Sequence, residues 1–144
     1  MAADDPLPDP ARLVLERRIE WIDTDAAGIY HWTTAFRLAE AAEAALHTAL
    51  GIVDATFGVT PRVSVSASFL RALRFNEAVA VELAVQAIGR ASLTYRLAIG
   101  GEAGPAVDGT LTICHVDRAA GRAVPWPPEV RERLASGGLQ RPPA

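Results

Sequence analysis

The sequence predicts an α+β domain in which a curved antiparallel sheet of about five strands wraps around one long helix. Three observations predict it: one segment of alternating polarity, then one long segment without Gly or Pro, then four further alternating segments. The later segments are joined by short links rich in turn formers, and short links join antiparallel neighbours because a parallel crossover needs a dozen or more residues. A sheet with one apolar face can bury that face against a helix.

The first strand is expected at Leu13–Trp21, where apolar residues alternate with charged ones and only Arg17 interrupts the apolar side. A turn over residues 23–28 follows. From about His31 to Leu50 the chain is dominated by Ala, Leu and Glu, which are strong helix formers, and Gly51 can end the helix in a left-handed conformation. We therefore expect a helix of about five turns, whose many alanines let a sheet approach closely.

Four further strands are expected, at Pro61–Leu70, Ala78–Ile88, Ser92–Ile99 and Val107–Val116. A short helix is expected after them, at Glu129–Ala135. Within the strand at Pro61–Leu70, apolar residues and serines alternate from Val63 to Phe69, as in a half-buried strand. We expect one domain over residues 11–136, with disordered tails at 1–10 and 137–144.

Composition excludes several classes of protein. The chain has 144 residues, 50% of them hydrophobic, and a net charge of −3, which fits one domain with a real core and gives no basic surface for nucleic acid. No segment has membrane-spanning length, and the acidic, Pro-rich N-terminus does not resemble a secretion signal. We expect a cytoplasmic protein with neither nucleic-acid nor membrane partners.

Several kinds of chemistry are also excluded or disfavoured. All fourteen basic residues are arginine, so a Schiff base and a lysine-containing phosphate loop are impossible. No G-x-S-x-G motif occurs, and His31, His47 and His115 are too far apart in sequence to form a metal motif. Cys114, the single cysteine, is expected to be a packed core residue. We expect no metal and no cofactor.

An acidic turn directly precedes the long helix. Free N–H groups at a helix start carry partial positive charge, so they can stabilise an oxygen that becomes negative during a reaction. A carboxylate beside such a helix start therefore suggests catalysis. Asp23 and Asp25 also have an ordinary explanation as turn formers, and Gly28 suits a turn with positive φ.

At these residues the chain resembles a known family. The segments D-T-D-A-A-G-I-Y-H-W, P-R-V-S-V-S-A-S-F-L and H-V-D-R-A-A-G-R, in this order around the helix, look like those of hotdog-fold acyl-CoA thioesterases of the 4-hydroxybenzoyl-CoA thioesterase group. The resemblance extends from Leu13 to about Leu134, and the D-x-D-x-A-G element is its most specific part.

The resemblance implies a role for individual residues. Asp25 would act as nucleophile or as general base, the backbone N–H of Trp32 would polarise the thioester oxygen, and His31 would have a supporting role. Asp23 would fix the turn. Further residues would bind substrate (Gly28, Ile29, Tyr30, Phe36 and Ser68) or the CoA phosphates (Arg71, Arg74 and Arg90). The resemblance also implies a homodimer or homotetramer with sites between subunits, and no cofactor.

Two other functions stay open at this stage. A hotdog enoyl-CoA hydratase also combines Asp and His at a helix start, but its D-x-N-P-[LIV]-H spacing differs from the one here. A non-catalytic acyl-thioester binding protein would have the same fold without turnover.

Glu40 and Glu43, three residues apart on the helix, are expected to be a solvated or salt-bridged stripe. The acyl group, whether aromatic or not, and its carrier, CoA or acyl-carrier protein, also stay open.

Overall fold

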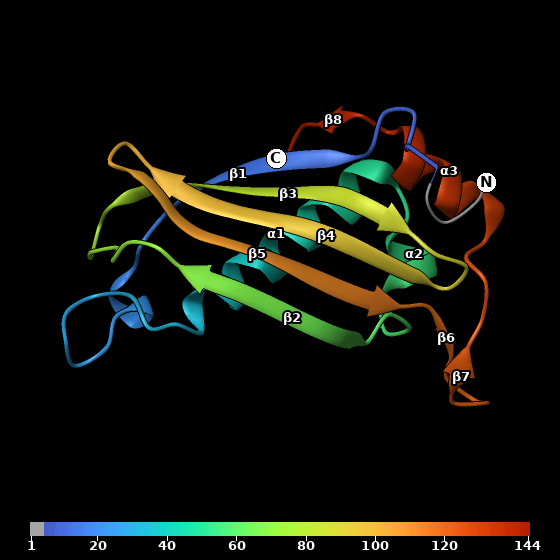
Figure 1. Ribbon diagram of the computed structural model, residues 1–144, viewed down its shortest axis with the longest axis horizontal. Helices are drawn as coiled ribbons and strands as arrows, with labels where there is room; N and C mark the ends of the chain where they lie inside the picture. Colours follow the sequence, from blue (N-terminus) through green and yellow to red (C-terminus); the bar gives the residue numbers. More distant parts are fainter. Residues whose placement is uncertain (1–4) are drawn as a thin grey trace.

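The computed structural model describes residues 5–144, in which a six-stranded sheet packs against one long helix (Figure 1). The strand order is β2-β5-β4-β3-β1-β8, and every neighbouring pair is antiparallel except β1 and β8. The strands are β1 (Arg12–Arg18), β2 (Arg62–Phe69), β3 (Ala78–Ile88), β4 (Ser92–Gly101), β5 (Gly104–Cys114) and β8 (Leu139–Gln140), with a separate hairpin of β6 (Val116–Asp117) and β7 (Arg122–Ala123). The helices are the 3-10 turn η1 (Trp21–Asp23), α1 (Thr34–Leu50), α2 (Val53–Thr56) and α3 (Pro128–Ser136).

Helix α1 lies against one face of the sheet, as the alanine-rich sequence predicts. Ala35, Ala39 and Ala42 are fully or almost fully buried, and their small side chains let the strands approach the helix backbone. From the sheet, large apolar side chains on β3, β4 and β5 alternate inward and fill the core. Gly51 ends α1 with φ of 68° and donates its N–H to the carbonyls of His47 and Thr48.

Three features differ from the sequence-based expectation. The first strand, expected to reach Trp21, ends at Arg18, and Trp21 lies in η1. Helix α1 begins at Thr34 instead of His31: the N–H of His31 is bonded to the carbonyl of Asp23 (2.7 Å), and Trp32 and Thr33 form a turn before the helix. The sheet has six strands instead of about five, because Leu139 and Gln140, expected in a loose tail, pair with β1. The N-terminal tail expected at residues 1–10 lies partly outside the described residues.

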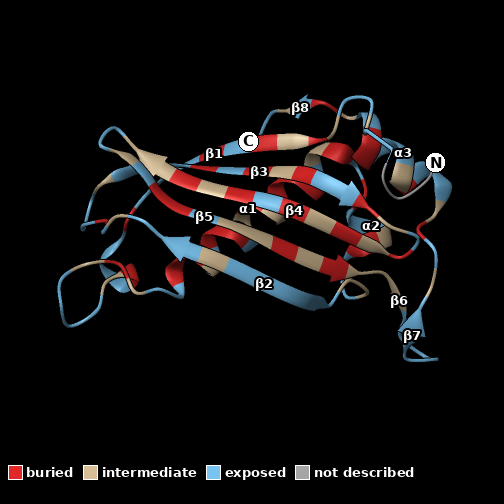
Figure 2. Ribbon diagram, in the orientation of Figure 1, coloured by how far each residue is buried: buried red, intermediate tan, exposed pale blue. Residues whose placement is uncertain are grey.

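Strand β2 lies at an edge of the sheet and is exposed along nearly its whole length (Figure 2). Its register with β5 places Val65 opposite Leu111 and Phe69 opposite Val107, so these side chains lie on the face of the sheet that carries α1. Helix α1 does not cover them: Val63 is 60% exposed and Phe69 46%. We call Val63, Val65, Ala67 and Phe69 the apolar face of β2. The serines of β2 lie on the opposite face.

Candidate active site

The acidic turn folds into a tight hairpin before α1. The N–H of Asp25 donates to the carbonyl of Ile29 (2.9 Å), and the N–H of Gly28 donates to the carbonyl of Asp25 (3.0 Å). Gly28 has φ of +77°, which glycine adopts without steric cost. The hairpin closes where Thr24 pairs with Tyr30. Its two ends are therefore fixed by backbone bonds and not only by side chains.

Asp23 is the buried anchor of this segment. Its Oδ2 accepts the N–H of Glu20 (2.6 Å), its Oδ1 forms an ion pair with Arg37 of α1, and its side chain is 2% exposed. Its carbonyl accepts both the N–H of His31 (2.7 Å) and the Oγ1 hydroxyl of Thr34 (3.0 Å). One residue thus ties the acidic turn to the start of α1, which is the structural part expected of it.

The Trp32 N–H lies in the turn that leads into α1. Among the hydrogen bonds of residues 5–144, none has this N–H as its donor, so it is available to an oxygen from outside the protomer. The Trp32 ring is 57% exposed and packs edge-on against Phe36, with 5.8 Å between ring centroids. The residue that carries this N–H is thus largely exposed.

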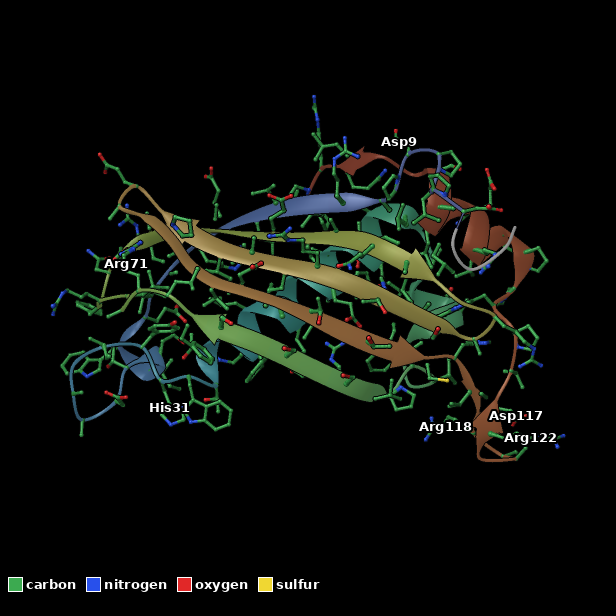
Figure 3. The ribbon with its side chains drawn as sticks, viewed as in Figure 1. Asp9, His31, Arg71, Asp117, Arg118 and Arg122 are labelled. Atoms are coloured by element: carbon green, nitrogen blue, oxygen red, sulfur yellow. The ribbon has the colours of Figure 1, made fainter. Side chains whose placement is uncertain are left out.

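His31 holds the helix start in place. Its Nδ1 accepts the N–H of Thr33 (3.2 Å) and contacts the Thr33 hydroxyl (2.7 Å), and its ring lies against Trp32. In Figure 3 it lies in the loop beside the end of β2. Its described contacts all lie within the helix start, so they support a role in fixing the Trp32 turn.

Asp25 itself is exposed. Its Oδ1 accepts the N–H of Ala27 (2.8 Å), which is the bond of an ordinary aspartate turn, and its side chain lines neither of the two largest cavities described here. In the protomer Asp25 is therefore a turn residue with one carboxylate oxygen open to solvent. Any reacting group must reach it from outside this chain.

The other residues expected to bind substrate lie in separate parts of the fold. Ile29 and Tyr30 lie in the hairpin, and Tyr30 is buried with its ring 6.4 Å from that of Phe69. Burial raises the pKa of Tyr30 above its usual value, and its hydroxyl has no hydrogen-bond partner among the described residues. Ser68 is exposed and faces Asp108, on the side of the sheet away from α1.

The three arginines expected at the CoA phosphates do not converge in the protomer. Arg71 donates to Glu77 (2.9 Å) and to the carbonyl of Gly104 (3.2 Å), so its guanidinium is already engaged. Arg74 is exposed and pairs through its backbone with Ile29 beside the acidic turn. Arg90 lies in the link between β3 and β4, at the opposite end of the sheet.

A second group of polar residues, which the sequence analysis did not bring together, lines a cavity of about 490 Å³ between α1, α2 and the start of β2. We call it the α1–α2 cleft; it is lined by Glu40, Glu43, Ala44, His47, Thr48, Val53, Thr56, Phe57, Gly58, Thr60, Pro61 and Arg62. Glu43 forms an ion pair with Arg62, as a salt-bridged stripe predicts, whereas Glu40 is exposed. The spacing of Glu40 and Glu43 on the helix could indicate an ion-pair site from the sequence. It could not indicate the partner, because Arg62 is 19 residues away from Glu43.

Burial controls ionisation in this cleft. It lowers the pKa of His47 to about 4, with the positive charge of Arg62 adding to the effect. It raises the pKa of Glu43, and Arg62 opposes part of that rise. His47 contacts Thr56 through Nδ1 (2.9 Å) and Tyr95 through Nε2 (2.5 Å), so both of its ring nitrogens are occupied.

Within residues 5–144, no cluster of three or more His, Cys, Asp or Glu side chains is arranged to hold a metal ion. None of the helices in this part of the chain has the length and apolarity needed to cross a bilayer. Cys114 is half-buried.

Comparison with solved structures identifies the fold. The chain superimposes on a protein from Bacillus stearothermophilus described as a predicted thioesterase, with a TM-score of 0.80, 20% identity, and coverage of 92% of this chain and 100% of the other. For a 4-hydroxybenzoyl-CoA thioesterase mutant in complex with 4-hydroxybenzoyl-CoA the TM-score is 0.75, with 21% identity and coverage of 88% and 99%. For a 1,4-dihydroxy-2-naphthoyl-CoA thioesterase from Synechocystis the TM-score is 0.74, with 17% identity and coverage of 85% and 95%.

These likenesses establish that the chain has the hotdog fold that the sequence predicts. A scan against models of protein families finds no match, and a search of curated proteins finds none.

Proposed function

We propose that this protein is an acyl thioesterase: water and an acyl thioester give a free acid and a thiol, which is CoA or an acyl-carrier protein. The observation that carries the proposal is the Trp32 N–H before α1, which has no acceptor within residues 5–144. It lies in the segment that Asp23 ties to the helix start, close in sequence to the exposed carboxylate of Asp25. The likeness to structures of thioesterases supports the same reaction.

The reaction needs a base or nucleophile on one side of the thioester carbonyl and a donor on its oxygen. In one route the Asp25 carboxylate attacks the carbonyl carbon, the thiolate leaves, and water hydrolyses the resulting anhydride. In the other, Asp25 takes a proton from the water that attacks. In both, the Trp32 N–H stabilises the oxyanion, an interaction whose removal costs about two to three orders of magnitude in rate in other enzymes.

A second copy of the chain completes the site in this proposal. Strand β2 has eight residues, so its unpaired edge is about 26 Å long, and its apolar face is open to solvent. A long, flat apolar edge is an aggregation hazard unless it is paired. Antiparallel pairing of β2 with its own copy, about a two-fold axis at Ser66, would bury both apolar faces, since it sets Val63 opposite Phe69 and Val65 opposite Ala67.

This pairing determines which parts of the two protomers meet. Helix α1 and β2 run in opposite directions, so the start of β2 lies near the end of α1 (Figure 1). In this proposed pairing, Arg62 of one protomer would lie near Leu70 of the other. Leu70 follows Phe69, whose ring contacts Tyr30, and Tyr30 closes the hairpin that carries Asp25. The acidic turn of each protomer therefore faces the α1–α2 cleft of its partner.

The test is thiol release from a panel of acyl thioesters, aryl and linear, on CoA and on acyl-carrier protein. Asp25→Asn should keep the fold and the dimer while abolishing turnover, and Asp54→Asn, an exposed aspartate on α2, is the matched control. Turnover by Asp25→Asn at the parent rate would show that Asp25 is not catalytic.

A non-catalytic acyl-thioester binding protein is the second candidate, because the Oδ1 of Asp25 is already bonded to Ala27. That function predicts a raised melting temperature with acyl-CoA and no thiol release from any member of the panel. A hydratase would instead consume enoyl-CoA without releasing thiol, so thiol detection together with a measurement of enoyl-CoA consumption separates all three.

A further inference from the structure

A patch of exposed apolar side chains lies next to the acidic turn. Trp21 is 81% exposed, Ile22 82% and Phe75 58%, and the rings of Trp21 and Phe75 lie 6.2 Å apart between centroids. We call these three residues the Trp21 patch. They come from η1 and from the link between β2 and β3, which lie at the same end of the sheet (Figure 1). None of them belongs to β2, so pairing of two β2 strands does not account for their exposure.

Backbone bonds fix the Trp21 patch to the hairpin that carries Asp25. The carbonyl of Trp21 accepts the N–H of Thr24 (3.1 Å) and the Thr24 hydroxyl (2.7 Å) at the start of the hairpin. Near the end of the hairpin, Ile29 pairs with Arg74 of the link between β2 and β3. A partner that docks on the patch therefore has a fixed position relative to the acidic turn.

Two arginines flank Phe75 without a carboxylate partner among residues 5–144. Arg74, the residue before Phe75, is exposed, and its guanidinium has no hydrogen-bond or ion-pair partner in this part of the chain. Arg18 is exposed and donates from Nη1 to the carbonyl of Asn76 (2.8 Å), the residue after Phe75. The patch therefore has a guanidinium on each side of its phenyl ring.

The carboxylates of the same two segments have other places in the structure. Glu77 is the ion-pair partner of Arg71 (2.9 Å), and Glu20 caps η1 with its side chain. Glu16 lines a cavity on the face of the sheet away from α1. Arg18 and the neighbouring free guanidinium can therefore meet acidic groups of a partner, although the net charge of the chain is −3.

The shape of the Trp21 patch favours a protein over a nucleotide as its partner. None of its three side chains lines the α1–α2 cleft or the cavity of about 760 Å³ on the other face of the sheet. Small ligands bind in concave sites, whereas protein interfaces are enriched in aromatic side chains and arginine. A second copy of the patch is a poor occupant, because a two-fold contact would set equal charges against each other.

We propose that the Trp21 patch is the docking surface for an acidic acyl-carrier protein, which delivers the acyl thioester to Asp25. In this complex the rings of the patch cover an apolar part of the carrier surface, and Arg18 and Arg74 pair with carboxylates beside it. The inference rests on the proposed thioester hydrolysis and names the carrier that this function leaves open. The residues of the patch take no part in breaking the thioester.

The first experiment measures kcat/KM for one acyl group on two carriers, an acidic acyl-carrier protein and CoA. Ile22→Ser and Phe75→Ser should lower kcat/KM for the carrier-protein thioester by about 10-fold or more, mainly through KM, and should leave the CoA thioester unaffected. Leu139→Ser, an exposed apolar residue on β8, is the matched control and should behave as the parent does. A parent that hydrolyses only the CoA thioester, or patch variants that lose equally with both carriers, would overturn the docking surface and leave the hydrolysis proposal intact.

Ionic strength tests the arginines. Salt screens opposite charges, so kcat/KM for the carrier-protein thioester should fall as the salt concentration rises. Arg18→Glu should lower it by about 10-fold or more at low salt and remove most of the salt dependence. Arg122→Glu makes the same change of charge in β7, at the opposite end of the molecule from Arg71 in Figure 3, and should keep the salt dependence of the parent. The same response in both variants would contradict docking at this surface.

Binding separates a failure of docking from a failure of hydrolysis. Calorimetry measures the binding of the unacylated carrier protein to the parent and to Phe75→Ser. Binding to the parent that is about 10-fold or more weaker in Phe75→Ser would support the docking surface even if no thioester is hydrolysed. No binding to the parent, or equal binding to both, would refute it. Sedimentation checks the other occupant: a smaller assembly in Phe75→Ser than in the parent would assign the patch to self-association.

Discussion

The phenolic O–H of Tyr95 donates a hydrogen bond to Nε2 of His47 across 2.5 Å, in the buried space between β4 and α1. The Thr56 hydroxyl donates its one hydrogen to the carbonyl of Ile52 (3.0 Å), so it must accept a hydrogen bond from Nδ1–H of His47 (2.9 Å). His47 is therefore neutral with its proton on Nδ1. This chain of bonds joins the sheet to both helices that border the α1–α2 cleft.

Replacing Tyr95 with Phe should destabilise the protein by about 1–3 kcal/mol, because Nε2 of His47 would be buried without a donor. Denaturant unfolding measures the change. Tyr30→Phe is the matched control: it also removes a buried tyrosine hydroxyl, but that hydroxyl has no partner among the described residues. Its removal should leave the free energy of unfolding unchanged or raise it, and an equal loss in both variants would contradict the proposed bond.

Stability should fall in mild acid because of His47. Its pKa is about 4 in the folded protein, against 6.5 ordinarily, so between these values the unfolded chain takes up a proton that the native state excludes. The free energy of unfolding should be highest above pH 6.5 and should decrease by about 3 kcal/mol as the pH falls toward 4.

His47→Gln isolates this contribution when its unfolding is followed over the same pH range. Glu43 acts with the opposite sign, because its pKa is raised in the folded state and protonation just above its ordinary value of 4.5 favours folding. The acid-dependent loss between pH 6.5 and 4 should therefore shrink or reverse in His47→Gln. An unchanged slope would assign the loss to other groups.

Gly28→Ala should cost about 1 kcal/mol from backbone strain alone. The residue has φ of +77°, and a Cβ placed there would meet no atom within 4 Å, so no steric clash adds to the cost. Thermal unfolding measures it. If the hairpin positions Asp25 as proposed, thiol release should fall by more than this small loss of stability explains.

Val65→Lys tests the dimer through β2. The side chain lies in the middle of the apolar face of β2 and is 45% exposed in the protomer, so a lysine there is compatible with the folded chain. Sedimentation should show a monomer with unchanged far-UV circular dichroism, and turnover should be lost with the dimer. Ser66→Thr, on the other face of the same strand, should remain a dimer. A dimeric Val65→Lys protein would exclude this pairing.

The main elements could be predicted from the sequence because their signals are local. Alternation over Ala78–Ile88 and the long run without Gly or Pro ending at Leu50 have the periods of a strand and a helix, and both elements end where expected. The helix start could not be predicted. His31 has no local signal against helix, yet it lies before the helix, with its N–H bonded to the carbonyl of Asp23, eight residues earlier.

The residues of the candidate site also fall into two groups: those that a local motif brings together and those that only the fold brings together. Asp25, Gly28 and the Trp32 turn are neighbours in sequence, so a motif could bring them together, and their catalytic roles stay predictions. The pairing of Glu43 with Arg62 and of His47 with Tyr95 joins residues that are 19 and 48 positions apart. No local pattern contains such pairs.

The sequence by itself determined the main strands and the long helix, their order and the acidic turn before α1, because backbone propensity and hydrophobic period act over a few residues. Only the tertiary structure decided that β2 is an exposed edge, that the tail adds a strand, and that a buried polar cleft forms behind α2. Those outcomes depend on which distant side chains meet and exclude water, and burial, not residue type, sets the ionisation of His47 and Glu43.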